Sequence, residues 1–264
     1  MIRFAMLGSG SAGNGLVVEC GSTRLLLDCG FSVKETAARL QRLGLSLDQL
    51  NGIVVTHEHD DHVSGVRGLA ARSGTPVFLT YGTLRALLDG DAPPAAERYQ
   101  IVDAGVPFAV GEIEVHPFAV PHDAREPVQY VFSDGDARLG VLTDTGSSTR
   151  HVEASLAACD SLVLECNHDG PMLAGSRYPR WLKERIGGDF GHLSNTQAAG
   201  ILGAIDKSRL SHVVAAHLST TNNTPAAAQR ALAEVLACEP AWIAVADQQA
   251  GLTWRDVHAA RGGG

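Results

Sequence analysis

The segment Thr56-His57-Glu58-His59-Asp60-Asp61-His62 follows the apolar run Ile53-Val54-Val55, which predicts a buried strand. In an extended backbone His57 and His59 point to the same side, and Asp61 and His62 can face back toward that point from the next turn. Imidazole nitrogens combined with a carboxylate are ligands suited to zinc, iron or manganese. The spacing therefore favours a metal centre at the end of this strand over a solvated polar loop.

Three further candidate ligands, His122, Asp144 and His217, stand at or just after the ends of apolar runs farther along the chain. A buried structural histidine needs only one hydrogen-bond partner and could lie anywhere along such a run. The repeated placement at run ends therefore favours ligands over structural residues. From the residues alone, His116 competes with His122 for this role.

The composition indicates a folded protein with a large core. The chain has 264 residues, of which 45% are hydrophobic and 19% charged, and this excludes extensive disorder. Lysine and arginine number 21 against 29 aspartate and glutamate residues, so the formal net charge is −8. This balance argues against binding of nucleic acid by net charge alone, but bound divalent cations would neutralise part of the acidic excess.

The cysteines and the apolar runs indicate the compartment. The five cysteines are scattered and form no Cys-x-x-Cys pair, which argues against a disulfide framework and against a thiolate zinc site. The apolar run at the start of the chain is too short for a signal peptide, and no run approaches the roughly 18–20 residues of a membrane span. We therefore expect a cytoplasmic protein that does not contact a membrane.

Short apolar runs alternate with helical patterns along the chain. Strands are predicted over residues 2–7, 15–20, 24–28, 53–55, 77–80, 112–118, 128–132, 139–143, 162–165, 213–216 and 242–246. Helices are predicted over residues 32–44, after His62 through Leu69, and near residues 151–158, 196–206 and 224–236. This order predicts an α/β fold of two sheets with outer helices. We expect one domain over residues 1–260 and a flexible tail over residues 261–264.

The glycine-rich stretch Gly8-Ser9-Gly10-Ser11-Ala12-Gly13 fits the GxGxxG fingerprint of dinucleotide-binding proteins. In those proteins a helix begins at the loop and its amino terminus faces a pyrophosphate. Here the chain continues directly into Leu16-Val17-Val18-Glu19-Cys20, which is a strand pattern. The sequence therefore favours a tight hairpin turn. If that turn borders a site, Ser9, Ser11 and Asn14 are candidate substrate contacts.

The complete set of motifs resembles that of the metallo-β-lactamase fold superfamily of hydrolases. The HxHxDH signature of the superfamily is matched by His57, His59, Asp61 and His62. Its later motifs, and the aspartate that precedes the signature, are matched by Asp28, His122, Asp144 and His217. The family position favours His122 over His116. Because the motifs span nearly the whole chain, the resemblance implies a four-layer αββα sandwich, with two mixed sheets flanked by helices.

Longer segments resemble the YycJ (WalJ)-like members of this superfamily, which are similar to ribonuclease Z-type phosphodiesterases. These segments are residues 7–11, 121–128, 164–169, 191–195 and 216–219. The resemblance implies a dinuclear metal-dependent nuclease, with DNA as the expected substrate and RNA as an alternative. It also implies an exonuclease activity and a connection to mismatch-repair proteins.

The resemblance further implies the roles of the site residues. One ion is expected on His57, His59 and His122, a second on Asp61, His62 and His217, and Asp144 is expected to bridge the two. Zinc and manganese suit these ligands, iron fits them as well, and two such cations can share a hydroxide nucleophile and hold a phosphate oxygen. Asp61 is also expected to orient the nucleophile, and His192 to contact the phosphate or donate a proton. Asp28 is expected to accept a hydrogen bond from a ligand imidazole.

A basic and aromatic segment, residues 177–185, carries four cations against one anion and includes Tyr178 and Trp181. Such a segment is typical either of a surface that contacts a phosphate backbone and stacks a base or of an ordinary solvated helix. In the first case Arg180 and Lys183 contact the substrate. Weaker candidates for the rim of the site are Arg125, Asn167 and His168.

Other classes of function are compatible with part of the pattern. A glyoxalase-II-like thioester or lactone hydrolase on the same fold also keeps the bridging aspartate, here Asp144. A flavodiiron-type oxidoreductase typically has glutamate where His59 stands, which argues against that class. A catalytically inactive binding protein would usually have lost a ligand, and the motifs of this chain are complete.

Overall fold

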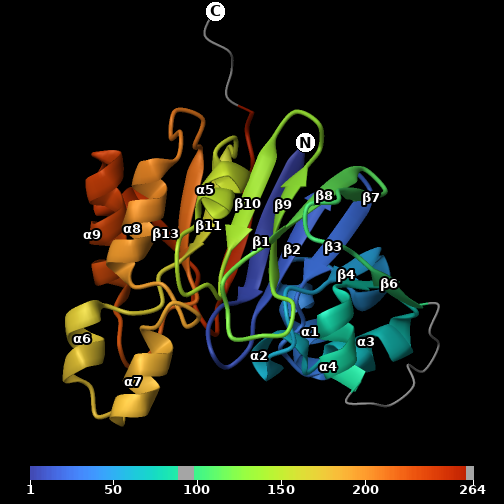
Figure 1. Ribbon diagram of the computed structural model, residues 1–264. Coiled ribbons are helices and arrows are strands. Elements are labelled where there is room, and N and C mark those ends of the chain that lie inside the picture. The colour runs from blue at the N-terminus through green and yellow to red at the C-terminus, as the bar shows by residue number, and fades with distance from the viewer. Residues whose placement is uncertain (89–97, 260–264) are drawn as a thin grey trace, which may run out of the picture.

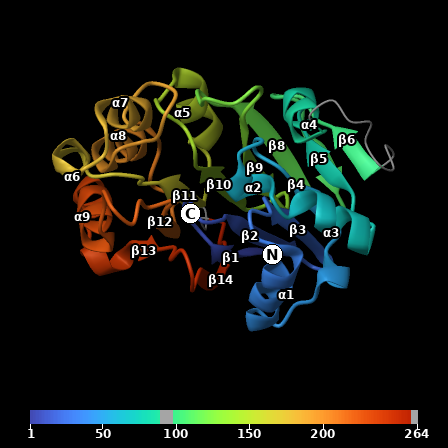
Figure 2. The same cartoon turned by 90° about the horizontal axis from the view of Figure 1, so that it is seen from below.

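The computed structural model describes residues 1–88 and 98–259. Within these ranges, two seven-stranded sheets face each other and helices cover their outer faces, which gives four layers (Figures 1 and 2). The predicted αββα sandwich with two mixed sheets is confirmed. The predicted tail, residues 261–264, lies outside the described residues.

The first sheet has the strand order β14-β1-β2-β3-β4-β5-β6. Its strands are β1 (Ile2–Gly8), β2 (Gly15–Cys20), β3 (Thr23–Leu27), β4 (Gly52–Val54), β5 (Val77–Leu79), β6 (Tyr99–Ile101) and β14 (Leu252–Asp256). Strands β14 and β1 to β3 pair antiparallel, whereas β3 to β6 run parallel. The helices in this half are α1 (Val33–Arg42), α2 (Asp60–Val63), α3 (Val66–Ser73) and α4 (Tyr81–Leu88), with a 3-10 turn at Leu47–Gln49.

The second sheet has the strand order β13-β12-β11-β10-β9-β8-β7. Its strands are β7 (Phe108–Val110), β8 (Ile113–Ala119), β9 (Val128–Ser133), β10 (Arg138–Leu142), β11 (Ser161–Glu165), β12 (His212–Ala216) and β13 (Ala244–Val245). Strands β7 to β10 pair antiparallel, and β10 to β13 run parallel. The helices in this half are α5 (Arg150–Leu156), α6 (Gly170–Gly175), α7 (Arg180–Ile186), α8 (Asn195–Ala204) and α9 (Pro225–Leu236), with a 3-10 turn at Pro240–Trp242.

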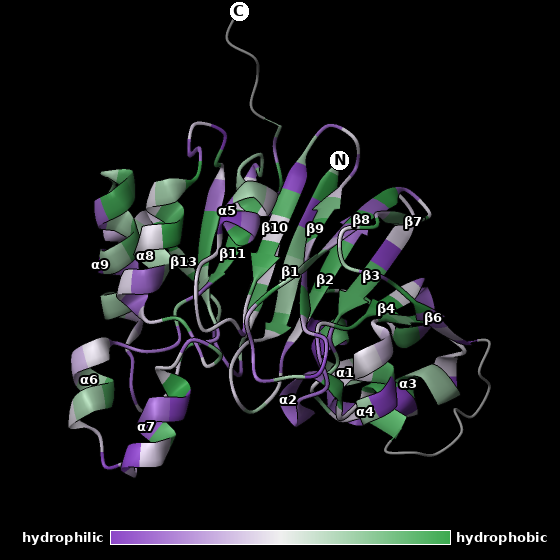
Figure 3. Cartoon of the chain, in the orientation of Figure 1, coloured by the Kyte–Doolittle hydropathy of each residue, from purple (hydrophilic) through white to green (hydrophobic). Residues whose placement is uncertain are grey.

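Apolar side chains fill the space between all four layers. The central core between the sheets includes the fully buried Phe4, Tyr130 and Phe132, and two further cores pack each sheet against its own helices. Figure 3 shows apolar residues along the strands and polar residues in the loops below them. Residues of both sheets share the central core.

Most predicted elements agree with the structure in position and type. The GxGxxG stretch is a hairpin turn, because β1 and β2 pair antiparallel on either side of it. The strand predicted over residues 242–246 is shorter in the structure and covers only Ala244–Val245. The residues before it form a 3-10 turn that begins at Pro240 and includes Trp242. The strands β6, β7 and β14 were not predicted, and each is a short or half-exposed edge segment without a buried apolar run.

Candidate active site

The residues of the site come from loops at the carboxyl ends of strands. Strands β3 and β4 run parallel in the first sheet, and β10, β11 and β12 run parallel in the second, so their carboxyl ends open at one edge of the sandwich. Asp28 follows β3, the HxHxDH segment follows β4, and Asp144, Glu165 and His217 end or follow the strands of the second sheet. Figure 1 shows these loops gathered beneath the sheets. The fold therefore brings together groups that are far apart in the sequence.

Three of these residues have an unusual backbone conformation. Asp28, Asp144 and His217 have φ angles of 59°, 51° and 53°, in the left-handed region that residues other than glycine rarely adopt. Among the described residues only one other non-glycine residue, Ala237, shares this feature. Strain of this kind persists where the surrounding structure imposes it, and it clusters at functional sites. At these three positions the left-handed conformation turns the backbone sharply just after a strand ends.

The first cluster consists of three imidazoles. His57 Nε2 lies 3.0 Å from His59 Nδ1, which lies 3.3 Å from His122 Nε2. The other ring nitrogen of His122 faces the Gly191 carbonyl at 3.0 Å, and that of His57 faces the Thr56 hydroxyl at 2.9 Å. Burial lowers the pKa of both His57 and His122, so these rings are neutral and present lone pairs.

The second cluster combines two imidazoles with two carboxylates. Asp61 Oδ2 lies 3.5 Å from His62 Nε2 and 3.4 Å from His217 Nε2. Asp144 lies on the other side of the same two rings, with Oδ2 3.1 Å from His62 Nε2 and Oδ1 3.5 Å from His217 Nε2. The pKa values of Asp61 and Asp144 are lowered, since the neighbouring His62 and His217 outweigh the effect of burial. Both carboxylates are therefore ionised.

The donor atoms fit divalent cations. The donor atoms lie within 4.8 Å of one another in each of three groups: His57, His59 and His122; Asp61, His62 and His217; and His57, His62 and Asp144. Ligand atoms on a tetrahedral zinc lie about 3.3–3.5 Å apart, because a Zn–N bond measures about 2.0–2.1 Å. Asp144 Oδ2 is buried and makes no hydrogen bond, although it lies 3.1 Å from His62 Nε2. A buried carboxylate oxygen without a partner is costly, and a bound cation would satisfy it.

Asp28 and Asn14 hold the second cluster in place. Asp28 Oδ2 accepts a hydrogen bond from His62 Nδ1 at 2.8 Å, which leaves Nε2 of His62 as the lone-pair nitrogen facing Asp61 and Asp144. The other Asp28 oxygen accepts from the Thr56 backbone N–H at 2.9 Å. The side-chain amide of Asn14 donates to Asp61 Oδ2 at 3.1 Å. The glycine-rich hairpin therefore positions a candidate ligand directly.

Glu165 connects His192 and His217. Its fully buried carboxylate accepts from His192 Nδ1 at 2.8 Å and lies 3.4 Å from His217 Nδ1. Its second oxygen accepts from the backbone N–H groups of Thr145 and Leu193. Burial lowers the pKa of His192, but the Glu165 carboxylate outweighs this effect and raises it. His192 therefore holds a proton at neutral pH more firmly than a free histidine does.

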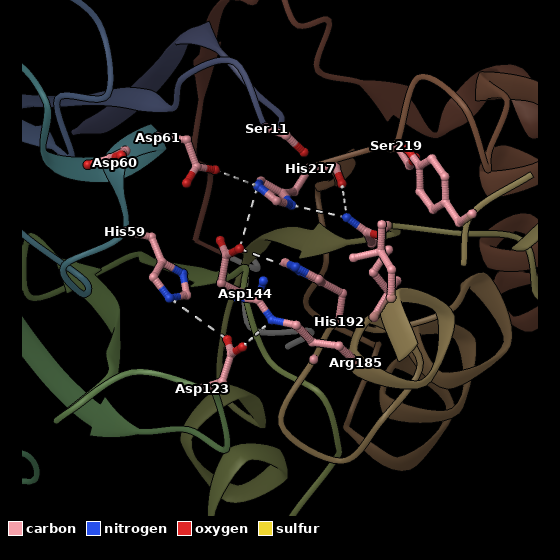
Figure 4. Close-up of a pocket in the computed structure, with 15 residues that line it drawn as sticks. Ser11, His59, Asp60, Asp61, Asp123, Asp144, Arg185, His192, His217 and Ser219 are labelled. Carbon is pink, nitrogen blue, oxygen red and sulfur yellow. Dashed lines mark hydrogen bonds and ion pairs between the residues drawn. The ribbon is translucent and has the colours of Figure 1, made fainter. Parts of the chain in front are cut away.

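The clusters open into a cavity of about 350 Å³. Figure 4 shows Asp61, His217, Asp144, His192 and His59 converging on its centre. Of the predicted site residues, those that line it are Ser11, His59, Asp61, Asn167, Asp144, His192 and His217. The deeper ligands His57, His62 and His122 are buried behind these groups.

Several predicted substrate contacts lie outside the cavity lining. Ser9 is buried and accepts a hydrogen bond from the His217 backbone N–H at 2.8 Å. His168, in the segment that follows β11, is also buried. Arg180 is 91% exposed and pairs with Glu184 one helical turn away. Lys183 and Arg125 are likewise outside the lining. The Lys183 side chain donates to the Ala174 carbonyl, and the Arg125 backbone N–H donates to Glu58.

The sequence assigned no individual role to several polar residues around the cavity, among them Asp123, Glu165 and Arg185. Glu165 ends an apolar strand just as Asp144 follows one, so its strand-end position was an available signal. Arg185 donates through Nε to Asp123 Oδ2 at 2.7 Å, and Figure 4 shows this pair on one side of the cavity. That pair joins segments 62 residues apart, and no local pattern reveals it.

An αββα sandwich with adjoining His/Asp metal-ligand clusters at the carboxyl edge of its sheets defines a metal-dependent hydrolase. The model of the Beta-lactamase superfamily domain matches residues 23–217, and the chain belongs to that superfamily. The chain is 36% identical over 237 residues to the exodeoxyribonuclease YycJ of Bacillus anthracis, covering 89% of each protein. It is 32% identical to the exodeoxyribonuclease WalJ of Streptococcus pneumoniae, covering 89% of this chain and 88% of the relative.

A solved structure shares the fold along almost the entire chain. The metallo-β-lactamase fold protein YhfI of Bacillus subtilis superposes with a TM-score of 0.73, covering 97% of this chain and 100% of that protein at 15% identity.

No helix among the described residues has the length and apolar character required to cross a membrane.

Proposed function

We propose that this protein is a dinuclear metal-dependent phosphodiesterase that degrades DNA as an exonuclease. The observation that carries the proposal is the placement of the Asp144 carboxylate against the second cluster, beside the three-imidazole cluster, in one cavity that also contains His192. Two cations about 3.5–4 Å apart are the arrangement used for in-line displacement at phosphorus. The names of the two relatives, which match across nearly their whole length, support DNA as the substrate.

The ligand roles follow from the clusters. His57, His59 and His122 would hold one ion, Asp61, His62 and His217 would hold the second, and Asp144 would be shared between them. Zinc and manganese are the expected metals for this mixture of nitrogen and oxygen ligands. When bound, such cations supply Lewis acidity toward the phosphate and lower the pKa of water. Asp61 lines the cavity and is held by the Asn14 amide, so it is placed to orient the attacking water.

His192 is the proposed proton donor to the leaving oxygen. Its Nδ1 donates to Glu165 at 2.8 Å, so the remaining ring nitrogen, Nε2, is available to the substrate. The ring lines the cavity and is partly exposed, with 23% of the side chain accessible. Because Glu165 raises the pKa of His192, the ring carries the proton that the departing alkoxide requires.

The test uses protein stripped of metal and reloaded with zinc or manganese. The substrates are linear duplex DNA, closed circular DNA, single-stranded DNA, a tRNA precursor, bis-p-nitrophenyl phosphate and a thioester. We expect stepwise shortening of linear DNA and no cleavage of the closed circle, because an exonuclease requires an end. Asp61→Ala and His62→Ala should abolish cleavage. Asp103→Asn is the control: it removes an exposed carboxylate that lies outside the cavity lining and belongs to no ligand cluster.

The other outcomes identify the alternatives. Cleavage of the tRNA precursor with DNA left intact would assign the protein to RNA processing. Turnover of the thioester without cleavage of any phosphodiester would overturn the proposal and favour the glyoxalase-II-like hydrolase. The proposed link to mismatch-repair proteins predicts a raised spontaneous mutation frequency when the gene is deleted in its host. An unchanged frequency would contradict that link and leave the nuclease activity intact.

A further inference from the structure

Phe190 is a large apolar side chain in an unusual place. It is 62% exposed, although exposure of so much aromatic surface is unfavourable. It lies between Asp189 and Gly191, and Gly191 lines the catalytic cavity. The Phe190 carbonyl accepts a hydrogen bond at 2.9 Å from the backbone N–H of Asp123, another residue of the cavity lining. Phe190 itself is not part of the cavity lining, but its backbone adjoins two residues that are, so it lies next to the rim.

The backbone around Phe190 is held firmly. The Asp189 carbonyl accepts from the Ser147 hydroxyl at 3.0 Å, and the Gly191 N–H donates to the Gly188 carbonyl at 2.9 Å. Gly191 packs so closely against the end of α7 that a Cβ there would overlap the Ile186 carbonyl. The loop thus presents its exposed ring on a rigid support, which lowers the entropy cost of binding through that ring.

The surroundings of Phe190 carry positive charge. Residues 177–190, which include its loop, contain four cations and two anions, in a chain whose net charge is −8. Two of the cations are paired, Arg180 with Glu184 and Arg185 with Asp123. Arg185 lines the cavity and is 58% exposed, and Trp181 on the same helix is 64% exposed. Figure 1 shows α7 projecting below the second sheet, at the same edge as the site loops. A polyanion that enters the cavity passes this wall.

We infer that Phe190 stacks on a nucleobase of the strand being cleaved, beside the scissile phosphodiester, and that α7 supplies the adjacent cations. This inference rests on the proposed nuclease function. An exposed aromatic ring on a rigid loop next to cationic side chains is the combination that proteins use to hold single nucleic-acid strands. Stacking accepts any base, so Phe190 contributes to affinity for polynucleotides and to placement of the terminal nucleotide, without selecting a sequence.

The experiment compares Phe190→Ala and Phe190→Trp with Trp242→Ala. Trp242 is the matched control, because it is 43% exposed in the 3-10 turn before β13 and, unlike Phe190, has no sequence neighbour in the cavity lining. Each protein, loaded with metal, is assayed on bis-p-nitrophenyl phosphate, on single-stranded DNA, and on the same DNA with an abasic nucleotide at one of its terminal positions. Light scattering gives the mass of each variant in solution.

We expect Phe190→Ala to lower kcat/KM on intact DNA by roughly 5- to 150-fold, the range that corresponds to the loss of one stacking contact. Phe190→Trp should retain activity on DNA. All variants should still cleave bis-p-nitrophenyl phosphate, which shows that the metal centre is intact. On DNA that is abasic at the stacked position, wild type and Phe190→Ala should differ by less than about twofold.

Failure of the inference is distinct from failure of the proposed function. If wild type cleaves DNA and Phe190→Ala cleaves it equally well, the stacking role is refuted and the nuclease assignment stands. An equal loss on intact and abasic DNA would refute it as well. A change in mass caused by Phe190→Ala would assign the ring to contact between two copies of the chain and also overturn the inference. If wild type cleaves no polynucleotide, the proposed function itself fails.

Discussion

The role of Glu165 can be tested by Glu165→Gln, which keeps the shape of the side chain and removes its charge. In the wild type one carboxylate oxygen accepts from the N–H groups of Thr145 and Leu193, and the other faces Nδ1 of both His192 and His217. A glutamine can place its single oxygen toward the two backbone N–H groups. Its NH₂ group then faces the imidazoles and must donate to them.

That reversal changes the tautomer of the imidazoles. A ring that accepts at Nδ1 carries its proton on Nε2, and Nε2 of His217 is the atom that faces Asp61 and Asp144 at 3.4 and 3.5 Å. A protonated nitrogen cannot ligate a cation. Loss of a partner that fixes a ligand histidine typically lowers metal affinity about 10–100-fold. In addition, a charge-assisted hydrogen bond of about 1.5–3 kcal/mol is replaced by a neutral one of about 0.5–1.5 kcal/mol.

The assay is titration of stripped protein with zinc in competition with a chromophoric chelator. We expect the dissociation constant of Glu165→Gln to rise about 10–100-fold, with activity restored in part by excess metal. Glu234→Gln, which makes the same change on an exposed face of α9, should leave the constant unchanged. Equal metal affinity of Glu165→Gln and wild type would refute this prediction, because a His217 ring that carries its proton on Nε2 must bind zinc more weakly.

Three further predictions concern stability and reactivity. In metal-free protein, burial lowers the pKa of His217, but Asp144, Asp61 and Glu165 outweigh burial and raise it to about 10. Protonated His217 stabilises the folded protein fully below the unfolded pKa of about 6.5, and this stabilisation is lost as the pH rises toward 10. The Tm measured in chelator should therefore fall between these pH values, and a constant Tm would contradict this prediction. A Cβ at Gly30 would overlap the Asp61 carbonyl, so Gly30→Ala should lower both Tm and metal content, whereas Gly200→Ala, in an open helix position, should raise stability by about 0.5–1 kcal/mol. Iodoacetamide should label the half-exposed Cys238 first, because the other four cysteines are buried and burial raises the pKa of Cys29 to about 11; peptide mass spectrometry showing equal labelling of a buried cysteine in native protein would be the contrary result.

The candidate ligands could be proposed from the sequence because most of them carry a local signal. His57, His59, Asp61 and His62 lie within one short segment after an apolar run, and Asp144 and His217 directly follow runs of their own. Apolar runs report buried strands reliably, since both faces of a central strand need apolar side chains. The half-exposed edge strands β6, β7 and β14 lack that signal, and they were missed.

By itself, the sequence determined the αββα class, the order of the strands that carry the site and the chemical types of the ligands. Only the tertiary structure decided which groups complete the cavity. Glu165 reaches His192 and His217 from a neighbouring strand, and Arg185 reaches Asp123 across 62 residues. Arg180, one of the candidate substrate contacts, pairs with Glu184 at the surface. These contacts depend on how distant strand ends and loops pack together. The short-range hydrophobic periodicity of the sequence contains no information about that packing.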